Sequence, residues 1–206
     1  MKIIKVRNKT EALNIALNYL PRNEASICFT GGDFGFGILK KIEESKLDIS
    51  YWSIFQTDER VDAEKKDNIQ DTILLRLKNC KGFNKMNCYF LPCKSSGQDL
   101  RNLLENHTSL KTKTFDVTFL SLGEDGHLAG HFENSTEINN HFTYTEEAPK
   151  LPKKRVSYNL KKLLDSKLII MACLGESKKK AYEELILGTN IHSEIIKHKG
   201  LVILRD

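Results

Sequence analysis

Short, almost continuously apolar segments recur along the chain and alternate with amphipathic ones. Their content of Ile, Leu, Val and Phe is typical of strands that are covered on both faces of a parallel sheet. Six segments have this character: 26–30, 49–55, 87–91, 115–122, 167–174 and 200–204. Between them, helical periodicity occurs over 10–20, 35–45, 67–79, 96–106 and 177–187. This alternation predicts a single three-layer α/β domain over residues 1–206, with a mostly parallel sheet.

Two segments carry further signals. The helix over 67–79 has a capping signal at its start, because Gln70 follows Asp67 at the three-residue spacing. The segment 131–155 lacks either periodicity, is polar and contains two of the four prolines. Such a stretch in a compact domain is often functional. We expect it to form a flap or an added edge hairpin beside a site.

The composition suits a globular protein with one substantial core: 206 residues, 40% of them hydrophobic and 29% charged. The net charge of +5 is modest, and acids and bases are mixed along the chain. It fits a small anionic substrate at least as well as nucleic acid. Basic residues are not interleaved with aromatic ones in a nucleic-acid-binding pattern, so no nucleic-acid partner is expected.

The five cysteines are scattered and form no CxxC pair, which indicates reduced, mostly buried thiols. No apolar run approaches the ~18 residues of a membrane span, and the start of the sequence has no apolar leader. We therefore expect a cytoplasmic monomer or weak homodimer with no membrane partner. No His, Cys and Glu set has metal-ligand spacing and no nucleophile elbow occurs, so a hydrolase would use activated water.

Polar loops follow four of the predicted strands: TGGD (30–33), QTDER (56–60), GEDGH (123–127) and GESKKK (175–180). In an open parallel sheet these loops lie together at the carboxyl ends of the strands. Ligands bind there, in the crevice where the strand order reverses. The sequence therefore predicts that the unusual side chains of these loops meet at one site.

In the first two loops, an anion site competes with plainer interpretations. Gly31 and Gly32 allow the backbone to approach a phosphate at a helix start, or they simply form a tight turn. Arg60 can bind a phosphate through its planar fork, and Asp58 can orient a hydroxyl or transfer a proton. The alternative for both charged residues is a solvated surface cluster.

The GEDGH loop carries the strongest catalytic signal. Gly126 permits a sharp bend that can point His127 back over the sheet, and Asp125 is close enough to influence it. Histidine exchanges protons near neutral pH. We therefore interpret His127 as catalytic rather than structural, and His131 as a rim or packing residue.

Basic residues also stand at two predicted element starts, Arg155 in KKRVSYNL and Lys180 in GESKKKAYEEL. Most lysines of the SKKK run are expected to be solvated. However, three lysines in a first helical turn oppose the helix dipole. That arrangement is easier to accept if one of them binds an anion.

Taken in order, these segments resemble the 6-phosphogluconolactonase branch of the family that also contains glucosamine-6-phosphate isomerase. The matching pieces extend from about residue 29 to residue 188: FTGGD, W…TDERV…DN, FDVTFLSLGEDGHLAGHF, PKKRVSYNL and CLGESKKKAYEELILG. The resemblance implies a Rossmann-like domain, hydrolysis of 6-phospho-glucono-δ-lactone in the oxidative pentose phosphate pathway, and no metal or organic cofactor. It also implies proton transfer by His127 and sugar-phosphate binding by Gly31, Gly32, Arg60, Arg155 and Lys180.

Two features favour the lactonase branch, namely the TDER run and Phe132, which stands where the isomerase pattern has a Glu that supports its histidine. In the expected mechanism, His127 activates a water molecule, while Asp125 and Asp58 position the imidazole, the water or the sugar hydroxyls. An amino-sugar-phosphate isomerase or deaminase is the alternative. A sugar-phosphate-binding protein without catalysis is another.

Asp33 departs from the family pattern, which has a small hydroxyl residue at this place. An ionised carboxylate that pointed into a phosphate cradle would repel the ligand. The other interpretation is that Asp33 caps the next helix, where Asp is favourable. We favour the cap, because Asp33 directly precedes the helical pattern.

Overall fold

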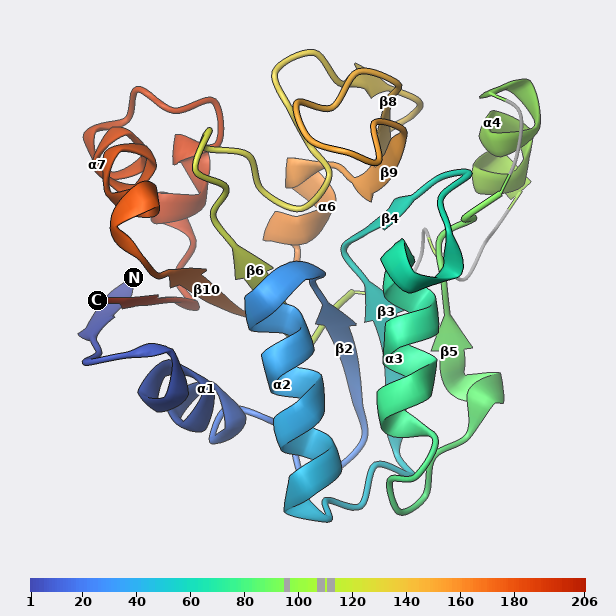
Figure 1. Cartoon of the computed structure of the whole chain (residues 1–206), viewed down its shortest axis with the longest axis vertical. Helices are drawn as coiled ribbons and strands as arrows, with labels where there is room; N and C mark the ends of the chain where they lie inside the picture. The colour runs from blue at the N-terminus through green and yellow to red at the C-terminus, as the bar shows by residue number, and fades with distance from the viewer. Residues whose placement is uncertain (95–96, 107–109, 111–113) are drawn as a thin grey trace.

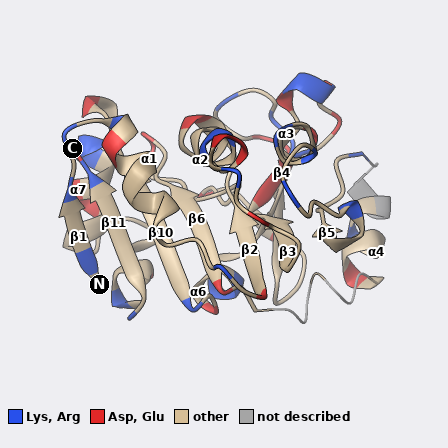
Figure 2. Ribbon diagram, turned by 90° about the horizontal axis from the view of Figure 1, so that it is seen from below, with Lys and Arg blue, Asp and Glu red and all other residues tan. Residues whose placement is uncertain are grey.

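The structure is a computed structural model of the chain, and it describes residues 1–94, 97–106, 110 and 114–206. Within these residues, seven parallel strands form one sheet in the order β1-β11-β10-β6-β2-β3-β5 (Figure 1 and Figure 2). Their bounds are Lys2–Lys5 (β1), Ala25–Phe29 (β2), Trp52–Gln56 (β3), Cys88–Tyr89 (β5), Val117–Ser121 (β6), Leu168–Cys173 (β10) and Leu201–Arg205 (β11).

Helices cover both faces of this sheet (Figure 2). On one face lie α1 (Lys9–Leu17), α2 (Gly32–Ser45) and α3 (Ile69–Leu77). On the other lie α4 (Gly97–Asn106), α6 (Leu160–Leu164) and α7 (Lys179–Leu187). Short 3-10 helices are η1 (Lys65–Asp67), η2 (Lys85–Asn87), η3 (Glu176–Lys178) and η4 (Ser193–Lys197). Alternate residues of β2 enter the two cores, Ile27 and Phe29 on one face and Cys28 on the other.

This three-layer arrangement confirms the predicted α/β fold. Each of the six apolar segments overlaps a strand of the main sheet. The strand β1 was not expected; it pairs with β11 at the edge of the sheet, and its side chains are mostly exposed. An edge strand buries too little surface to require the continuous apolar run that characterises the other strands of this sheet. Of the described helices, none is long and apolar enough to cross a membrane.

A second, antiparallel sheet has the order β4-β9-β8-β7. Its strands are Asp58–Arg60 (β4), Arg155–Tyr158 (β9), Phe142–Thr145 (β8) and Thr136–Glu137 (β7). The segment 131–155 therefore contains a hairpin, as expected, but the hairpin extends a separate sheet rather than the edge of the main one. In the β4–β9 pair, Arg60 lies directly opposite Arg155.

The strand order reverses between β2 and β6. From β2 the chain continues to β3 and β5 on one side, whereas β6, β10 and β11 follow on the other side. The loops that leave β2 and β6 therefore flank a crevice at the carboxyl edge of the sheet, which is where open α/β sheets bind ligands.

Candidate active site

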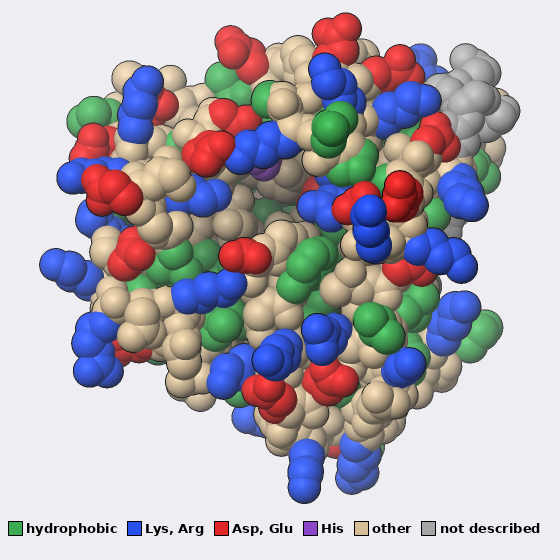
Figure 3. Space-filling view, in the orientation of Figure 1, with side chains coloured by type: hydrophobic (Ala, Val, Ile, Leu, Met, Phe, Trp, Pro, Cys, Tyr) green, Lys and Arg blue, Asp and Glu red, His purple; other side chains and the backbone are tan. Residues whose placement is uncertain are grey.

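A cavity of about 480 Å³ opens at this reversal point. Six of the predicted site residues line it: Gly31, Gly32, Asp58, Arg60, His127 and Arg155. Its charged lining consists of the bases Lys9, Arg60, Lys150, Arg155 and Lys178 and the acids Asp33, Asp58 and Glu124. In the space-filling view, a histidine side chain is visible at the back of a hollow between basic side chains (Figure 3). The excess of basic groups suits an anionic ligand.

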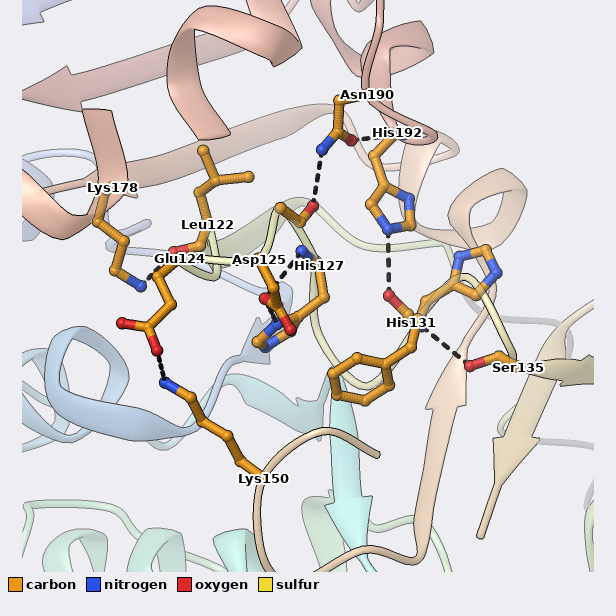
Figure 4. A network of polar contacts seen from close by, with 12 residues as sticks. Leu122, Glu124, Asp125, His127, His131, Ser135, Lys150, Lys178, Asn190 and His192 are labelled. Carbon is orange, nitrogen blue, oxygen red and sulfur yellow. Dashed lines mark hydrogen bonds and ion pairs between the residues drawn. The ribbon is translucent and has the colours of Figure 1, made fainter. Parts of the chain in front are cut away.

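At the GEDGH loop, Nδ1 of His127 hydrogen-bonds to Oδ1 of Asp125 (Figure 4). A carboxylate only accepts hydrogen bonds, so Nδ1 is the donor in this pair, and in the neutral imidazole Nε2 then keeps a lone pair. Burial raises the pKa of Asp125, but the hydrogen bond and charge of His127 outweigh this, and the pKa is lowered overall. The ring of Phe132 packs on the imidazole with centroids 4.5 Å apart. This arrangement leaves Nε2 of His127 as the available proton acceptor.

Gly123 was not singled out from the sequence, yet the pair depends on it. A Cβ atom at this position would lie 2.2 Å from Nδ1 of His127 and 2.5 Å from Oδ1 of Asp125. Gly126, whose φ is 84°, makes the turn. Gly126 therefore provides the bend of the GEDGH loop, and Gly123 provides the space for the side chains of Asp125 and His127.

The segment after α7 is hydrogen-bonded to the GEDGH loop (Figure 4). Asn190 donates from Nδ2 to the carbonyl of Gly126 at 3.2 Å, and its Oδ1 accepts from the backbone of His192 at 2.7 Å. Nε2 of His192 donates to the carbonyl of His131 at 3.1 Å. The rings of His131 and His192 pack 4.9 Å apart, so His131 is a packing residue, as expected.

Arg60 and Arg155 stand opposite each other across the β4–β9 pair and both line the cavity. Arg155 is only 6% exposed. Burial lowers the pKa of Arg155, the charge of Asp58 raises it, and the charge of Arg60 lowers it further. Two like charges directly opposite each other destabilise a strand pair. An anion bound between the two guanidinium groups would relieve this repulsion.

Asp58 is the acidic member of this cluster. It is almost fully buried, lines the same cavity and accepts a hydrogen bond from Oγ1 of Thr57 at 2.7 Å. Gly130 approaches it closely, since a Cβ atom there would lie 3.0 Å from the Cβ of Asp58. The structure thus brings Asp58 and His127 to one cavity, as the sequence predicted for their loops, and Arg155 lines the same cavity from β9.

The structure corrects the choice of lysine. Lys180 lies outside the cavity, its side chain is 86% exposed, and it pairs with Glu184 at 3.6 Å. Lys178 lines the cavity instead and donates from Nζ to the carbonyl of Leu122. Burial, followed by the charge of Lys150, lowers the pKa of Lys178. Lys178 ends η3 directly before α7, and the sequence pattern of the SKKK run does not distinguish it from Lys180.

The capping prediction for Asp33 was wrong. Gly31 is the N-cap of α2, and no side chain makes a cap hydrogen bond there. Asp33 lies in the first helical turn, its side chain is 98% exposed, and its Oδ2 is 3.1 Å from Nζ of Lys9. The helix begins earlier than its apolar pattern, since Gly32 already belongs to it.

Lys150, in the segment before β9, also lines the cavity. Lys150 forms an ion pair with Glu124 of the GEDGH loop (Figure 4). This contact joins the segment 131–155, in which we expected a flap or hairpin, to the loop that carries His127.

Comparison with known proteins places these features in one family. The profile of glucosamine-6-phosphate isomerases/6-phosphogluconolactonases matches residues 7–201. The chain belongs to this family of sugar-phosphate enzymes. It is 26% identical to a glucosamine-6-phosphate deaminase of Streptococcus sanguinis over 230 residues, which cover 100% of this chain and 96% of the relative. It is 31% identical to a 6-phosphogluconolactonase of Borreliella burgdorferi over 100 residues, covering 45% of this chain and 43% of the relative.

Solved structures of the same family share its fold. The 6-phosphogluconolactonase of Thermotoga maritima superposes with a TM-score of 0.82 at 17% identity, covering 99% of this chain and 98% of the other. A monomeric glucosamine-6-phosphate deaminase gives a TM-score of 0.75 at 16% identity, covering 100% and 97%. Relatives with either activity in their names are thus similar, and the choice between the two branches of the family depends on the site itself.

Proposed function

We propose that the protein is a 6-phosphogluconolactonase, which hydrolyses 6-phospho-D-glucono-1,5-lactone to 6-phospho-D-gluconate. The surroundings of His127 are the observation that carries this proposal. One nitrogen is bound to Asp125, and the ring face is covered by Phe132 rather than by a second carboxylate. An imidazole oriented in this way is equipped to activate water.

In the proposed reaction, a water molecule attacks the lactone carbonyl carbon while Nε2 of His127 accepts one of its protons. The tetrahedral intermediate carries the negative charge on the former carbonyl oxygen. The carbonyl re-forms as the bond to the ring oxygen breaks, and His127 returns the proton to that oxygen. The products are a new hydroxyl group and a carboxylic acid, which releases its proton to solvent. Asp125 stabilises the protonated imidazole in the intermediate state.

Arg60 and Arg155 bind the phosphate in this proposal, and Lys178 adds positive charge on the β10 side of the cavity. The cross-strand position of the two arginines supports this assignment, because a phosphate can accept hydrogen bonds from both planar forks. Charge-assisted hydrogen bonds of this kind contribute roughly 1.5–3 kcal/mol each.

Deamination of glucosamine 6-phosphate is the second candidate. The buried position of Asp58 beside the cavity favours it, because this reaction needs a carboxylate that removes a proton from carbon. His127 would then assist ring opening. The similarity to the Streptococcus sanguinis deaminase over the whole chain supports the same reading.

The two reactions have different products, so one experiment separates them. Purified protein is mixed with freshly made 6-phosphogluconolactone at mildly acidic pH, where spontaneous hydrolysis is slow. The product 6-phosphogluconate is measured through its dehydrogenase. A parallel sample receives glucosamine 6-phosphate, and ammonium is measured. We expect accelerated lactone hydrolysis without ammonium release; ammonium release without faster hydrolysis would assign the deaminase reaction.

A further inference from the structure

Glu59 occupies the middle of β4, between two residues that line the cavity. Side chains alternate along a strand, so Asp58 and Arg60 lie on one side of β4 and Glu59 on the other. Glu59 is 0% exposed and lies against the start of α3. A carboxylate without access to water is stable only when its oxygens have hydrogen-bond donors.

Four donors satisfy this carboxylate. Oε1 accepts from the backbone nitrogens of Arg60 at 2.7 Å and Ile69 at 2.8 Å. Oε2 accepts from the backbone of Gln70 at 2.9 Å and from Nε2 of Gln56 at 2.9 Å. Burial raises the pKa of Glu59, and these hydrogen bonds oppose the rise. Glu59 therefore takes the place of a local cap on α3, which the side chain of Asn68 does not provide.

The start of α3 also holds the side chain of Arg60. Nη1 of Arg60 donates to the carbonyl of Asp67 at 2.5 Å. Gly31 makes room for the start of α3, since a Cβ atom there would lie 2.6 Å from the side chain of Ile69. The backbone nitrogen of Arg60 is thus hydrogen-bonded to Glu59. Its guanidinium group is hydrogen-bonded to the carbonyl of Asp67, in the segment that leads into the start of α3 bound by Glu59.

We infer that Glu59 is a positioning residue for anion recognition, which holds Arg60 opposite Arg155 through the start of α3. Repulsion between the two guanidinium groups would otherwise favour movement of Arg60 away from its partner. Holding them together in advance lowers the cost of binding a phosphate group between them. The inference rests on the proposed function for the identity of the phosphorylated ligand.

The substitution Glu59→Gln tests this directly, because electrostatics and positioning predict opposite effects. Removal of a negative charge near a cationic site strengthens anion binding by charge alone. Loss of the carboxylate that docks α3 weakens it. We expect the Kd of 6-phosphogluconate, measured by calorimetry, to rise about tenfold, while kcat with the lactone changes less than threefold. Binding of unphosphorylated gluconate should be unaltered.

Asp71→Ala is the matched control. It removes the acidic side chain in the first turn of α3 itself, and this carboxylate accepts a hydrogen bond from Asn68 rather than from Arg60. Both variants should lower Tm, but only Glu59→Gln should weaken phosphate binding. Equal weakening in both variants at equal loss of Tm would show that Glu59 matters only for helix stability and would overturn the inference, as would unchanged or tighter binding in Glu59→Gln.

Gln56→Met provides a milder variant if Glu59→Gln does not fold, because it removes a single donor to Oε2. Its Kd for 6-phosphogluconate should rise two- to fourfold, and an unchanged value would count against the inference. Titration with inorganic phosphate keeps the two proposals separate. Wild-type protein that binds phosphate but does not hydrolyse the lactone contradicts the proposed function alone, whereas wild-type protein that binds no phosphate contradicts both.

Discussion

The imidazole of His127 and the carboxylate of Asp125 form a hydrogen-bonded pair although only one residue separates them in the sequence. Asp125 does not line the cavity of about 480 Å³ at the reversal of the strand order. It borders a neighbouring cavity of about 660 Å³, and His127 lines both cavities. The carboxylate therefore contacts the imidazole from outside the cavity in which the substrate would bind. This is the geometry of a base and its orienting acid.

His127→Ala should reduce kcat for lactone hydrolysis by roughly 10²–10⁴-fold, which is the usual contribution of a positioned general base. Asp125→Asn should reduce it less, by roughly tenfold or more, because the imidazole remains but loses its charged partner. Both are measured by the coupled assay, with 6-phosphogluconate binding as the control for an intact site. Wild-type turnover in His127→Ala would remove this residue from the mechanism.

Gly123→Ala should lower kcat while leaving the fold nearly as stable as before. The added methyl group would overlap with both side chains of the pair and force them apart. Gly123, unlike Gly126, does not require a positive φ, so the backbone itself tolerates alanine. Comparison of kcat and Tm tests this, and full activity would show that the pair is not needed.

Lys178→Ala should weaken binding of 6-phosphogluconate by roughly 10- to 150-fold, corresponding to one charge-assisted contact. Lys180→Ala removes the same charge two residues away, where the side chain is solvated and paired with Glu184. It should change the Kd less than twofold. Similar losses in both variants would indicate a general effect of net charge rather than a contact made by Lys178.

Asp33→Ser should change both stability and affinity only slightly. The carboxylate makes no cap hydrogen bond and its pairing with Lys9 is exposed, so it contributes at most about 0.5–1 kcal/mol to stability. Although Asp33 lines the cavity, its carboxylate is 98% exposed and paired with Lys9, so solvent and this pairing screen its charge from a bound ligand. We expect less than a threefold change in Kd for 6-phosphogluconate; a tenfold gain would mean that Asp33 opposes phosphate binding.

Acidification should destabilise the protein through His192. Burial, with the nearby His131 as the second cause, lowers the pKa of His192 to about 4. The unfolded chain takes up the proton first, so the free energy of unfolding falls as the pH drops from about 6.5 to about 4. The full shift corresponds to roughly 3 kcal/mol. This loss is fully absent above pH 6.5 and complete only below pH 4.

Urea unfolding of wild-type protein and His192→Gln at pH 7 and pH 4.5 measures this effect. The amide of Gln can still donate to the carbonyl of His131, but it does not titrate. The variant should therefore lose less stability between the two pH values. Equal losses would show that other groups account for the acid sensitivity.

The order of strands and helices was determined locally, by the sequence. Segments that are buried on both faces of a sheet need continuous apolar residues, and helices need the 3.6-residue period, so each leaves its pattern in the chain. His127, Asp58 and Arg60 could be found for a related reason, because polar groups that follow an apolar strand stand out, and Arg155 was found as a basic residue at the start of a predicted element. The short helix α6 and the exposed strand β1 left no such pattern.

Other features were decided only by the tertiary structure, because they depend on residues that are distant in sequence. Helix α3 is capped by Glu59 from β4, ten residues before its first turn, rather than by the local signal at Asp67. Arg60 meets Arg155 through a strand pair that joins positions 95 residues apart in the chain. The choice of Lys178 over Lys180 followed from the rotation of α7 against the core, which is set by burial of Ala181 and Leu185. The sequence therefore indicates which side chains lie near the end of a strand. Tertiary packing decides which of these side chains face the cavity.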